Sequence, residues 1–436
     1  MKVNIPESKQ KRVVIVGGGF AGLNLAKKLA KANYQVVLVD KNNYHQFQPL
    51  FYQVAMAGLE PSSIAFPLRK TFQKHKNIYI RVTEVLEADL SNNCLKTTLG
   101  IMNFDYLVLA IGADTNFFGN KNLSKHCIPM KSVGEALYLR NAIFNDYEIA
   151  LSTDNYEERQ GYIDVVIVGG GPTGVEVAGA LAEMKKYILP KDYPELNNEE
   201  VDIYLIQSGN RLLKGMSEEA AAKAKEYLEN LGVKIILNNR VMDVDEEFVY
   251  MKDETKIRSR KVIWAAGITG NKIKGLPDDC TVRGNRLKVN RFNQVECFDN
   301  VFAIGDIAYM EEEDFPNGHP QVAQVAIQQG KHLAKNLKNL SKGKELMPFK
   351  YKDLGAMATI GRHLAVVDLP RFKTQGSFAW FVWLFVHLFA LIGMRNKVIV
   401  FINWLWNYFT YDQSLRLIIK VKDLKNTPQK VAKEQA

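Results

Sequence analysis

The sequence has few cysteines, and they stand far apart. Four occur among 436 residues, namely Cys94, Cys127, Cys280 and Cys297. No two of them have C-x-x-C or C-x4-C spacing, so the sequence predicts neither a dithiol redox centre nor a metal site. We therefore expect free thiols in a reducing compartment.

The sequence also lacks the apolar segments that insert into membranes. The first twelve residues, MKVNIPESKQKR, have no apolar core, so we expect neither a signal peptide nor an anchor there. The longest apolar run, residues 378–394, has 17 residues and is followed by charged Arg395 and Lys397. A spanning helix needs about 20 apolar residues, so a membrane span is not expected.

Charge is unbalanced towards the basic side, without a nucleic-acid motif to explain it. The formal net charge is +10 and the isoelectric point is about 9.1. Such an excess fits nucleic acid, an anionic membrane surface or an acidic substrate. The length predicts two to three domains, and the apolar content of 47% is that of a globular protein.

The stretch that is most informative runs from Arg12 to Asp40. An apolar run typical of a buried parallel strand leads into Gly17, Gly19 and Gly22, which have G-x-G-x-x-G spacing. A helical pattern and a second strand follow, and Asp40 comes 18 residues after Gly22. Strand, glycine turn, helix, strand and acid together predict a dinucleotide site, with the pyrophosphate at the helix N-terminus and the acid on a ribose.

The same layout occurs a second time. Gly169, Gly171 and Gly174 follow another apolar strand, and Pro172 stands at the start of the next helix. Gly17 and Gly112 are 95 residues apart in the first copy, and Gly169 and Gly267 are 98 apart in the second. Two copies of nearly equal length predict an α/β fold with two Rossmann-like domains.

The copies differ at the acid, because Gln207 stands where the first copy has Asp40. A carboxylate at this place accepts from a ribose 2′-hydroxyl and repels a 2′-phosphate. Our hypothesis is that the second site tolerates NADPH as well as NADH. The alternative is that Gln207 changes little.

Three segments between the motifs carry further expectations. Asn, Gln and aromatic residues are frequent in the stretch after Asp40. This stretch is either a segment along the ligand or a connection with a core helix near 51–57. The pattern of residues 78–87 predicts one strand. Asp306, just after an apolar strand, suits ligand hydroxyls. Small residues at 323, 326, 330 and 334 predict a close packing partner, while Gln324 and Gln328 share a face that points either to a ligand or to solvent.

The tail is apolar, aromatic and basic. It holds four of the five tryptophans (Trp380, Trp383, Trp404 and Trp406), and from Arg371 onward it has ten basic and three acidic residues, a net charge of +7. These features favour a monotopic anchor, with helices over about 376–410, on anionic lipid. The alternatives are a spanning helix and a core or dimer-interface helix.

With both Gly-rich motifs and the tail in view, the chain resembles type II NADH dehydrogenases, the single-subunit, non-proton-pumping NADH:quinone oxidoreductases within the two-dinucleotide-domain flavoproteins. The likeness covers nearly the whole chain. It rests on VVIVGGGFAGL, NNYHQFQPLFYQVA, LAIGADTNFFG, VIVGGGPTGVEVAGALAE, VIWAAGI, FAIGDIA, AQVAIQQG and HLFALIGMRNKVIVFINWLWNY.

The resemblance implies a discontinuous FAD domain (1–115 and 275–340), an NAD(P)H domain (116–274) and a C-terminal membrane-docking domain (341–436). It implies that Glu176 lies near flavin and nicotinamide, and that Gln324 and Gln328 lie on the quinone side. Gln207 departs from the acid of many relatives, which puts strict NADH specificity in doubt. The expected FAD-binding residues are Gly17, Gly19, Gly22, Asp40, Lys41, Val85, Ala110, Gly112, Gly305 and Asp306. The expected NADH-binding residues are Gly169, Gly171, Gly174, Gln207 and Gly267.

The implied reaction passes a hydride from NADH to FAD and then two electrons to ubiquinone or menaquinone. Quinone also needs two protons, and Glu176 is the first candidate for a relay, with water as the alternative. The implied setting is a peripheral protein on the cytoplasmic face of the inner (plasma) membrane. We also expect a homodimer and no nucleic-acid partner.

Two rival functions remain. A sulfide:quinone oxidoreductase shares the layout but needs cysteines that cycle between redox states, and Cys127 has no obvious partner nearby in sequence. A flavoprotein similar to apoptosis-inducing factor would be a redox-dependent binding module. Lipoamide-type disulfide reductases need the missing C-x4-C, and ferredoxin or rubredoxin reductases give no reason for the tail.

Overall fold

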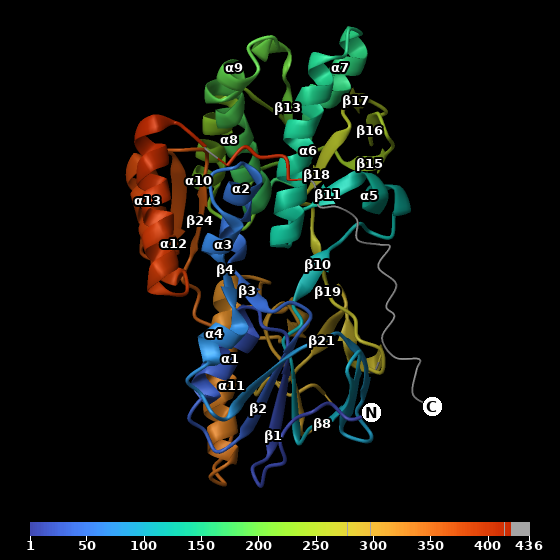
Figure 1. The fold of residues 1–436 in the computed structure, drawn as a ribbon, viewed down its shortest axis with the longest axis vertical. Coiled ribbons are helices and arrows are strands. Elements are labelled where there is room, and N and C mark those ends of the chain that lie inside the picture. The colour runs from blue at the N-terminus through green and yellow to red at the C-terminus, as the bar shows by residue number, and fades with distance from the viewer. Residues whose placement is uncertain (277, 297, 414, 420–436) are drawn as a thin grey trace, which may run out of the picture.

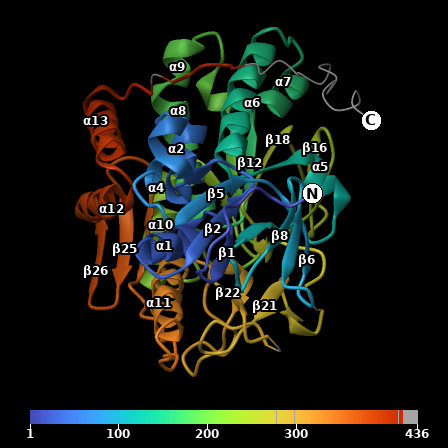
Figure 2. The same cartoon turned by 60° about the horizontal axis from the view of Figure 1, so that its bottom comes forward.

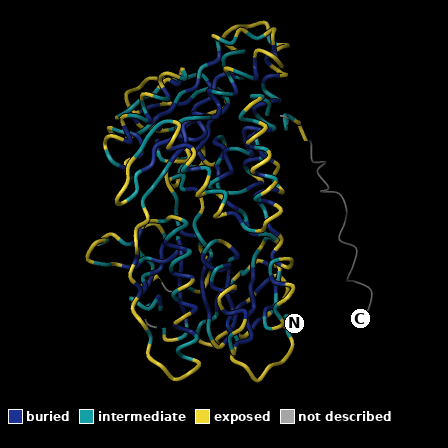
Figure 3. Tube along the Cα trace, turned by 90° about the vertical axis from the view of Figure 1, so that its left-hand side faces the viewer, coloured by how far each residue is buried: buried dark blue, intermediate teal, exposed yellow. Residues whose placement is uncertain are grey.

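The computed structural model describes residues 1–276, 278–296, 298–413 and 415–419. Two lobes are stacked along the long axis of the molecule (Figure 1), and each is built around a parallel five-stranded sheet. The buried parts of the trace lie inside the lobes, while exposed residues gather at loops and outer faces (Figure 3). The expected α/β class with two Rossmann-like units is confirmed.

The first lobe, which contains the N-terminus, has the strand order β22-β9-β1-β2-β5. Alternate residues of its strands point into two apolar clusters, because Val13 and Ile15 face the helices α1 and α11 while Val14 and Val16 face two small three-stranded sheets. The sheet strands are β1 (Arg12–Val16), β2 (Gln35–Asp40), β5 (Ile78–Val82), β9 (Tyr106–Leu109) and β22 (Val301–Ala303). The covering elements are α1 (Phe20–Leu29), α11 (Ala323–Leu340), β6 (Val85–Asp89), β7 (Cys94–Thr97), β8 (Gly100–Asn103), β20 (Thr281–Val282), β21 (Arg286–Lys288) and β23 (Ala308–Tyr309).

Helices α1 and α11 pack closely because α11 presents small residues. A Cβ added at Gly330 would lie 2.4 Å from the carbonyl oxygen of Ala21, so only glycine fits at this contact. The expectation that the small face of α11 meets a close neighbour is confirmed, and α1 is that neighbour.

The second lobe repeats the design with the order β11-β18-β12-β13-β14. Val165 and Ile167 point into the cluster formed with helices α6, α8 and α10, and the opposite face packs on a three-stranded antiparallel sheet. The strands are β11 (Cys127–Pro129), β12 (Val165–Val168), β13 (Ile203–Ile206), β14 (Val233–Ile236), β15 (Val241–Val244), β16 (Phe248–Met251), β17 (Lys256–Arg258) and β18 (Lys261–Trp264). The helices are α5 (Lys121–His126), α6 (Val133–Leu151), α7 (Tyr156–Ile163), α8 (Pro172–Tyr187), α9 (Leu189–Asp192) and α10 (Glu218–Asn230).

Two strands connect the lobes. β10 (Ala113–Thr115) and β19 (Ile268–Gly270) pair antiparallel between them (Figure 1). β10 follows β9 of the first glycine-motif copy, and β19 follows β18 of the second. The pairing of β10 with β19 therefore holds the ends of β9 and β18 near the junction of the lobes. Short elements after Asp40 complete this region: β3 (Tyr44–Gln46), α2 (Phe51–Ala55), α3 (Pro61–Ile64), β4 (Ala65–Pro67) and α4 (Leu68–Phe72).

One expected strand is divided in two. Residues 78–87 read as a single strand, but β5 ends at Val82 and β6 begins at Val85. β5 pairs with β2 as far as Asp40, where β2 also ends, and β6 then pairs antiparallel with β7. The prediction was wrong because an apolar pattern continues across a change of sheet.

The C-terminal region lies along one flank of the molecule (Figures 1 and 2) and consists of an antiparallel sheet and two helices. These are β24 (Ala356–Thr359), β25 (Ala365–Leu369), β26 (Phe372–Gly376), α12 (Ser377–Ala390) and α13 (Met394–Thr410). The helices are separated at Gly393, whose φ is +81°, and the charged residues at 395 and 397 lie inside α13. Asn396 is buried and donates to the carbonyls of Ser62 and Ser63 at 2.9 Å, which fixes α13 to α3.

Both helices present apolar side chains to solvent. The large apolar residues exposed on α12 are Phe378, Phe381, Phe385, Val386 and Phe389, and those on α13 are Met394, Val398, Phe401, Ile402, Leu405, Trp406 and Phe409. We call this set the tail face. Of the four tail tryptophans only Trp406 belongs to it, because Trp380, Trp383 and Trp404 are buried. Within the described ranges, no helix is both long enough and apolar enough to cross a membrane.

Candidate dinucleotide and electron-transfer site

The first glycine turn is shaped by close backbone contacts. Gly17 has a φ of +107°, and a Cβ there would lie 2.2 Å from the carbonyl oxygen of Ala110. A Cβ at Gly22 would lie 1.9 Å from the carbonyl oxygen of Gly17. Gly19 is different, since nothing lies within 4 Å of the position of its Cβ. The fold therefore requires glycine at two positions, while at Gly19 it leaves space beside the backbone.

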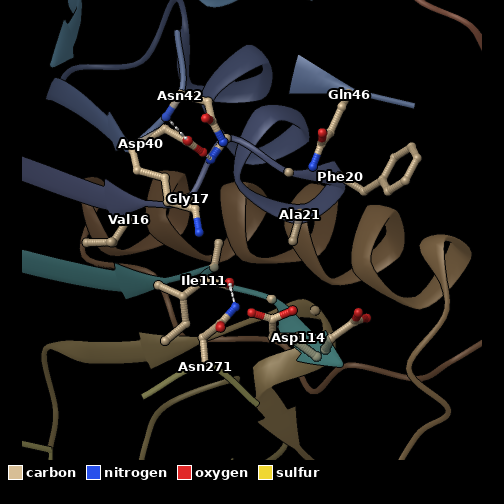
Figure 4. A pocket seen from close by; sticks show the side chains of 18 of the residues that line it. Val16, Gly17, Phe20, Ala21, Asp40, Asn42, Gln46, Ile111, Asp114 and Asn271 are labelled. Carbon is tan, nitrogen blue, oxygen red and sulfur yellow. Dashed lines mark hydrogen bonds between the residues drawn. The ribbon is translucent and has the colours of Figure 1, made fainter. Parts of the chain in front are cut away.

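Asp40 holds this turn from the end of β2. Its Oδ2 accepts from the backbone N–H of Gly18 at 2.6 Å, and its Oδ1 accepts from that of Asn42 at 2.7 Å (Figure 4). Burial raises the pKa of Asp40, and these two bonds and nearby Lys41 oppose that shift.

A cavity of about 420 Å³ opens beside the turn (Figure 4). Nine of the ten residues expected for the first nucleotide line it, and Gly22 lies behind the turn instead. The nine are Gly17, Gly19, Asp40, Lys41, Val85, Ala110, Gly112, Gly305 and Asp306. Further residues line the cavity, among them Phe20, His45, Gln46, Lys131, Glu135, Asn271 and Gln321. Of these, His45 and Gln46 belong to the stretch after Asp40 for which a place along the ligand was one of the two expectations.

The buried polar groups around this cavity suit a large polar ligand such as FAD. His45 is buried, and burial lowers its pKa to about 4, so the ring is neutral. Its Nδ1 lies 2.9 Å from the carbonyl oxygen of Gly18 and must donate, which leaves Nε2 as an acceptor without a partner among the described residues. Burial raises the pKa of Asp306, whose charged neighbours are Lys131 and Arg286. An unpaired acceptor and a partly buried carboxyl fit a ligand that carries hydroxyl and N–H donors.

The backbone of this cavity is held by a side chain on the buried face of α11. Gln329 is fully buried on α11, and its Oε1 accepts from the N–H of Gly305 at 2.7 Å. The bond fixes the Gly305–Asp306 turn from behind. No sequence signal distinguishes Gln329 from its neighbour Gln328, because the two differ only in which face of α11 they occupy.

The second glycine turn repeats the geometry of the first. Gly169 has a φ of +112°, and its added Cβ would lie 2.6 Å from the carbonyl oxygen of Ala265. A Cβ at Gly174 would lie 1.9 Å from the carbonyl oxygen of Gly169, and nothing lies within 4 Å of a Cβ at Gly171. Gln207 takes the place of Asp40, because its Oε1 accepts from the N–H of Gly170 at 3.0 Å.

Glu176 lies on α8, away from the residues that line the cavity. The side chain is buried, and burial raises its pKa to about 8, although a hydrogen bond from the backbone of Thr359 opposes the shift. Tyr52, on α2, is also buried, and its hydroxyl lies 3.0 Å from Oγ1 of Thr359. The carboxyl is therefore protonated at neutral pH and sits where α8, α2 and β24 meet.

Gln324 and Gln328 share one face of α11, as expected, but their amides bind backbone. Gln324 accepts from the N–H of Leu354 at 2.9 Å and donates to the carbonyl of Gly355 at 3.0 Å. Gln328 pairs in the same way with both backbone groups of Lys352. Neither lines the cavity, so in this structure both hold the segment 352–355 against α11.

The described cysteines do not form a redox pair. Cys94, Cys127 and Cys280 are buried, and no disulfide joins the described cysteines. Burial raises the pKa of Cys94, and raises that of Cys127 to about 12, so both thiols are protonated and weakly reactive. Cys297 lies outside the described residues.

Comparison with known proteins gives matches over nearly the whole chain. Residues 11–330 match the family "Pyridine nucleotide-disulphide oxidoreductase", and residues 354–410 match the "NDH2 C-terminal domain". The chain is similar to the "Type II NADH:quinone oxidoreductase Ndh" of Mycobacterium tuberculosis, with 34% identity over 411 residues that cover 91% of this chain and 88% of that protein.

Two solved structures have a similar fold. One is NDH2 from Plasmodium falciparum in complex with NADH, with a TM-score of 0.85, 22% identity, and coverage of 94% of this chain and 100% of that chain. The other is the sulfide:quinone oxidoreductase from Aquifex aeolicus, with a TM-score of 0.71, 20% identity, and coverage of 92% and 96%. At these identities the likeness concerns the fold alone.

Proposed function

The chain belongs to the type II NADH:quinone oxidoreductases, and on that premise we propose that it oxidises NADH and reduces a membrane quinone without pumping protons. The observation that carries the proposal is identity of 34% across both glycine-motif halves and the tail. Bound FAD supplies the hydride acceptor and the two-electron donor.

The proposed FAD contacts follow from the cavity. Gly19 leaves room for the pyrophosphate, Asp40 holds the turn and accepts from ribose, and Asp306 accepts from the ribityl chain. Gly22 acts through the close packing of the turn. The other proposed contacts are Gly17, Lys41, Val85, Ala110, Gly112 and Gly305.

The proposed NADH contacts lie at the second turn. Gly171 leaves room for the pyrophosphate there, and Gly169 and Gly174 allow the turn to form. Gln207 follows β13 and Gly267 follows β18, the two strands that flank β12, so they lie on either side of the turn that follows β12. We propose the division into an FAD domain (1–115 and 275–340), an NADH domain (116–274) and a docking domain (341–436).

Quinone reduction consumes two protons, and Glu176 is the proposed source of one. Its pKa of about 8 keeps a proton available at neutral pH. We propose that Gln324 and Gln328 act on the quinone side by positioning the segment 352–355, and that their amides do not contact the quinone directly.

Steady-state NADH oxidation by the FAD-loaded protein tests the proposed reaction. We expect fast turnover with a short-chain quinone and slow turnover without an acceptor. Turnover with sulfide but not with NADH would instead identify a sulfide:quinone oxidoreductase, which the protonated thiols of Cys94 and Cys127 disfavour. Slow turnover with every acceptor would favour the binding-module alternative.

Replacing Gln207 by glutamate is expected to lower kcat/KM for NADPH by about tenfold or more, with little change for NADH. Glutamate can keep the bond from Gly170, as Asp40 does from Gly18, but adds a negative charge that repels a 2′-phosphate. The wild-type protein is the matched control for both substrates. Strong discrimination against NADPH by the wild type would show that the missing acid does not set the preference.

We propose that the tail face docks on anionic lipid and brings the protein to its quinone. Large aromatic side chains exposed together favour such an interface, and Arg395 and Lys397 lie beside them on α13. The cytoplasmic side of the membrane and the homodimer stay predictions.

The double substitution of Phe385 and Phe389 by aspartate is expected to weaken binding to anionic vesicles by about 100-fold or more. These rings are 63% and 62% exposed, and burial of one such ring contributes about 1.5–3 kcal/mol. A matched control places aspartate at Tyr156 and Met242, which are 55% and 51% exposed and lie in the second lobe. Equal loss of vesicle binding in both pairs would mean that charge, and not the tail face, determines docking.

A further inference from the structure

A tight turn after β10 contains an aromatic residue in an unfavourable conformation. The N–H of Asn120 donates to the carbonyl of Phe117 at 3.0 Å and closes a turn whose two central residues are Phe118 and Gly119. Both central residues have positive φ, +53° and +79°. Turns of this kind prefer asparagine or glycine at the first central position, and a bulky side chain there is strained.

The ring of Phe118 is also exposed, so burial in the core does not compensate for the strain. Its exposed fraction is 68%. The ring lies edge-on to Trp264 with centroids 6.5 Å apart, and its Cζ would be 3.3 Å from a Cβ at Gly267. A strained and exposed aromatic residue is a reason to look for a ligand.

Asn116 fastens this turn to the end of β18. Its Oδ1 accepts from the N–H of Phe118 at 2.8 Å, its carbonyl accepts from Nε1 of Trp264 at 2.9 Å, and its N–H donates to the carbonyl of Gly267 at 3.2 Å. The ring is therefore held at a defined place rather than on a free loop.

That place is the carboxyl edge of the second sheet. β12 and β18 are parallel neighbours with Val168 opposite Trp264, so the Gly169 turn and the Gly267 segment lie next to each other. β13, which ends near Gln207, lies on the other side of β12. In open α/β sheets the ligand binds at this edge, where the strand order reverses.

The order of the strands indicates which part of the dinucleotide lies at the end of each strand. The ribose of the adenosine half belongs at Gln207 beyond β13, and the pyrophosphate belongs at the turn after β12. The nicotinamide half must then extend over the end of β18. Phe118 and Gly267 lie together at that end, because the Cζ of Phe118 is 3.3 Å from the position of a Cβ at Gly267.

We propose that Phe118 contacts the nicotinamide half of NADH and forms the apolar wall of its binding site. This inference rests on the proposed function and adds a residue to its substrate site. The ring offers a flat apolar surface, which suits the sugar or the ring of the ligand.

The substitution Phe118→Asn separates binding from folding, because asparagine is the residue that the turn prefers. We expect KM for NADH to rise by about tenfold, the size of a favourable aromatic contact, and the melting temperature to stay equal or rise. The inhibition constant of 5′-AMP, which fills only the adenosine half, is expected to stay within about twofold. Tyr156→Asn, an exposed aromatic on α7, is the matched control with an unchanged KM.

Any other result for the Phe118→Asn variant overturns the proposal. An unchanged KM for NADH would mean that the ring does not contact the substrate, and an equal loss for 5′-AMP would place the contact on the adenosine half. A lowered melting temperature with a normal KM would make Phe118 a structural residue. Failure of the wild type to oxidise NADH with quinone would instead overturn the proposed function.

Discussion

Replacing Gly171 by valine is expected to leave a folded protein that binds FAD but has a KM for NADH about 100-fold higher. The φ and ψ of Gly171 are −77° and −179°, which any residue adopts, and apart from adjoining backbone no atom of the described residues lies within 4 Å of the added Cβ. The Cβ of the new side chain therefore meets no obstacle from other segments of the protein. It fills the space that lets backbone N–H groups approach a pyrophosphate, and each such charge-assisted bond is worth about 1.5–3 kcal/mol.

The two motif copies provide the controls for this experiment. Gly19→Val is its counterpart in the first copy and should remove FAD while sparing the fold, since its surroundings are equally open. Gly174→Ala should instead damage the second lobe, because its Cβ would lie 1.9 Å from a backbone oxygen. FAD content, melting temperature and KM for NADH distinguish the three. A Gly171→Val protein with a normal KM would show that NADH does not bind at this turn.

Replacing Glu176 by glutamine is expected to lower quinone-dependent turnover by about 100-fold while NADH still bleaches the flavin. General acid catalysis contributes about 10²–10⁴-fold, and glutamine keeps the shape but has no proton to give. The wild-type rate with quinone should fall as pH rises through about 8, where the carboxyl loses its proton. That decrease should be absent in the variant. Identical pH profiles of the wild type and the variant would mean that water, and not Glu176, supplies the proton to the quinone.

The same substitution changes stability in a predictable direction. The pKa of Glu176 is raised from 4.5 to about 8 in the folded protein, so between these values the unfolded chain loses a proton that the folded protein keeps. The free energy of unfolding of the wild type therefore falls across this window and levels above it. Glu176→Gln should be more stable than the wild type, by an amount that grows from about pH 5 to pH 8. Melts at both pH values measure this.

Much of the site was predictable because the two turns are local. Three glycines, one strand and one helix fix each turn, so spacing alone located Gly17, Gly19 and Asp40 around a real cavity. The Gln207 exchange was visible for the same reason. Its hydrogen bond to Gly170 was not, because that needs the side-chain direction.

The remaining features depend on contacts between distant segments. Gln324 and Gln328 share a helix face, yet only the path of residues 352–355 reveals that their amides bind backbone. The aromatic tail was recognised, but three of its tryptophans pack inward and phenylalanines supply most of the exposed aromatic face. The periodicity of apolar residues predicts a helix, but which of its sides is buried depends on the segment of the protein that it packs against.

The most direct test of the proposed reaction is an anaerobic experiment in two additions. NADH is added to the FAD-loaded protein while the flavin absorbance is followed, and a short-chain quinone is added once the absorbance is steady. We predict rapid bleaching by NADH and rapid, complete return of the absorbance with quinone, at one quinone per flavin. A flavin that NADH bleaches but quinone does not restore would contradict the proposed function.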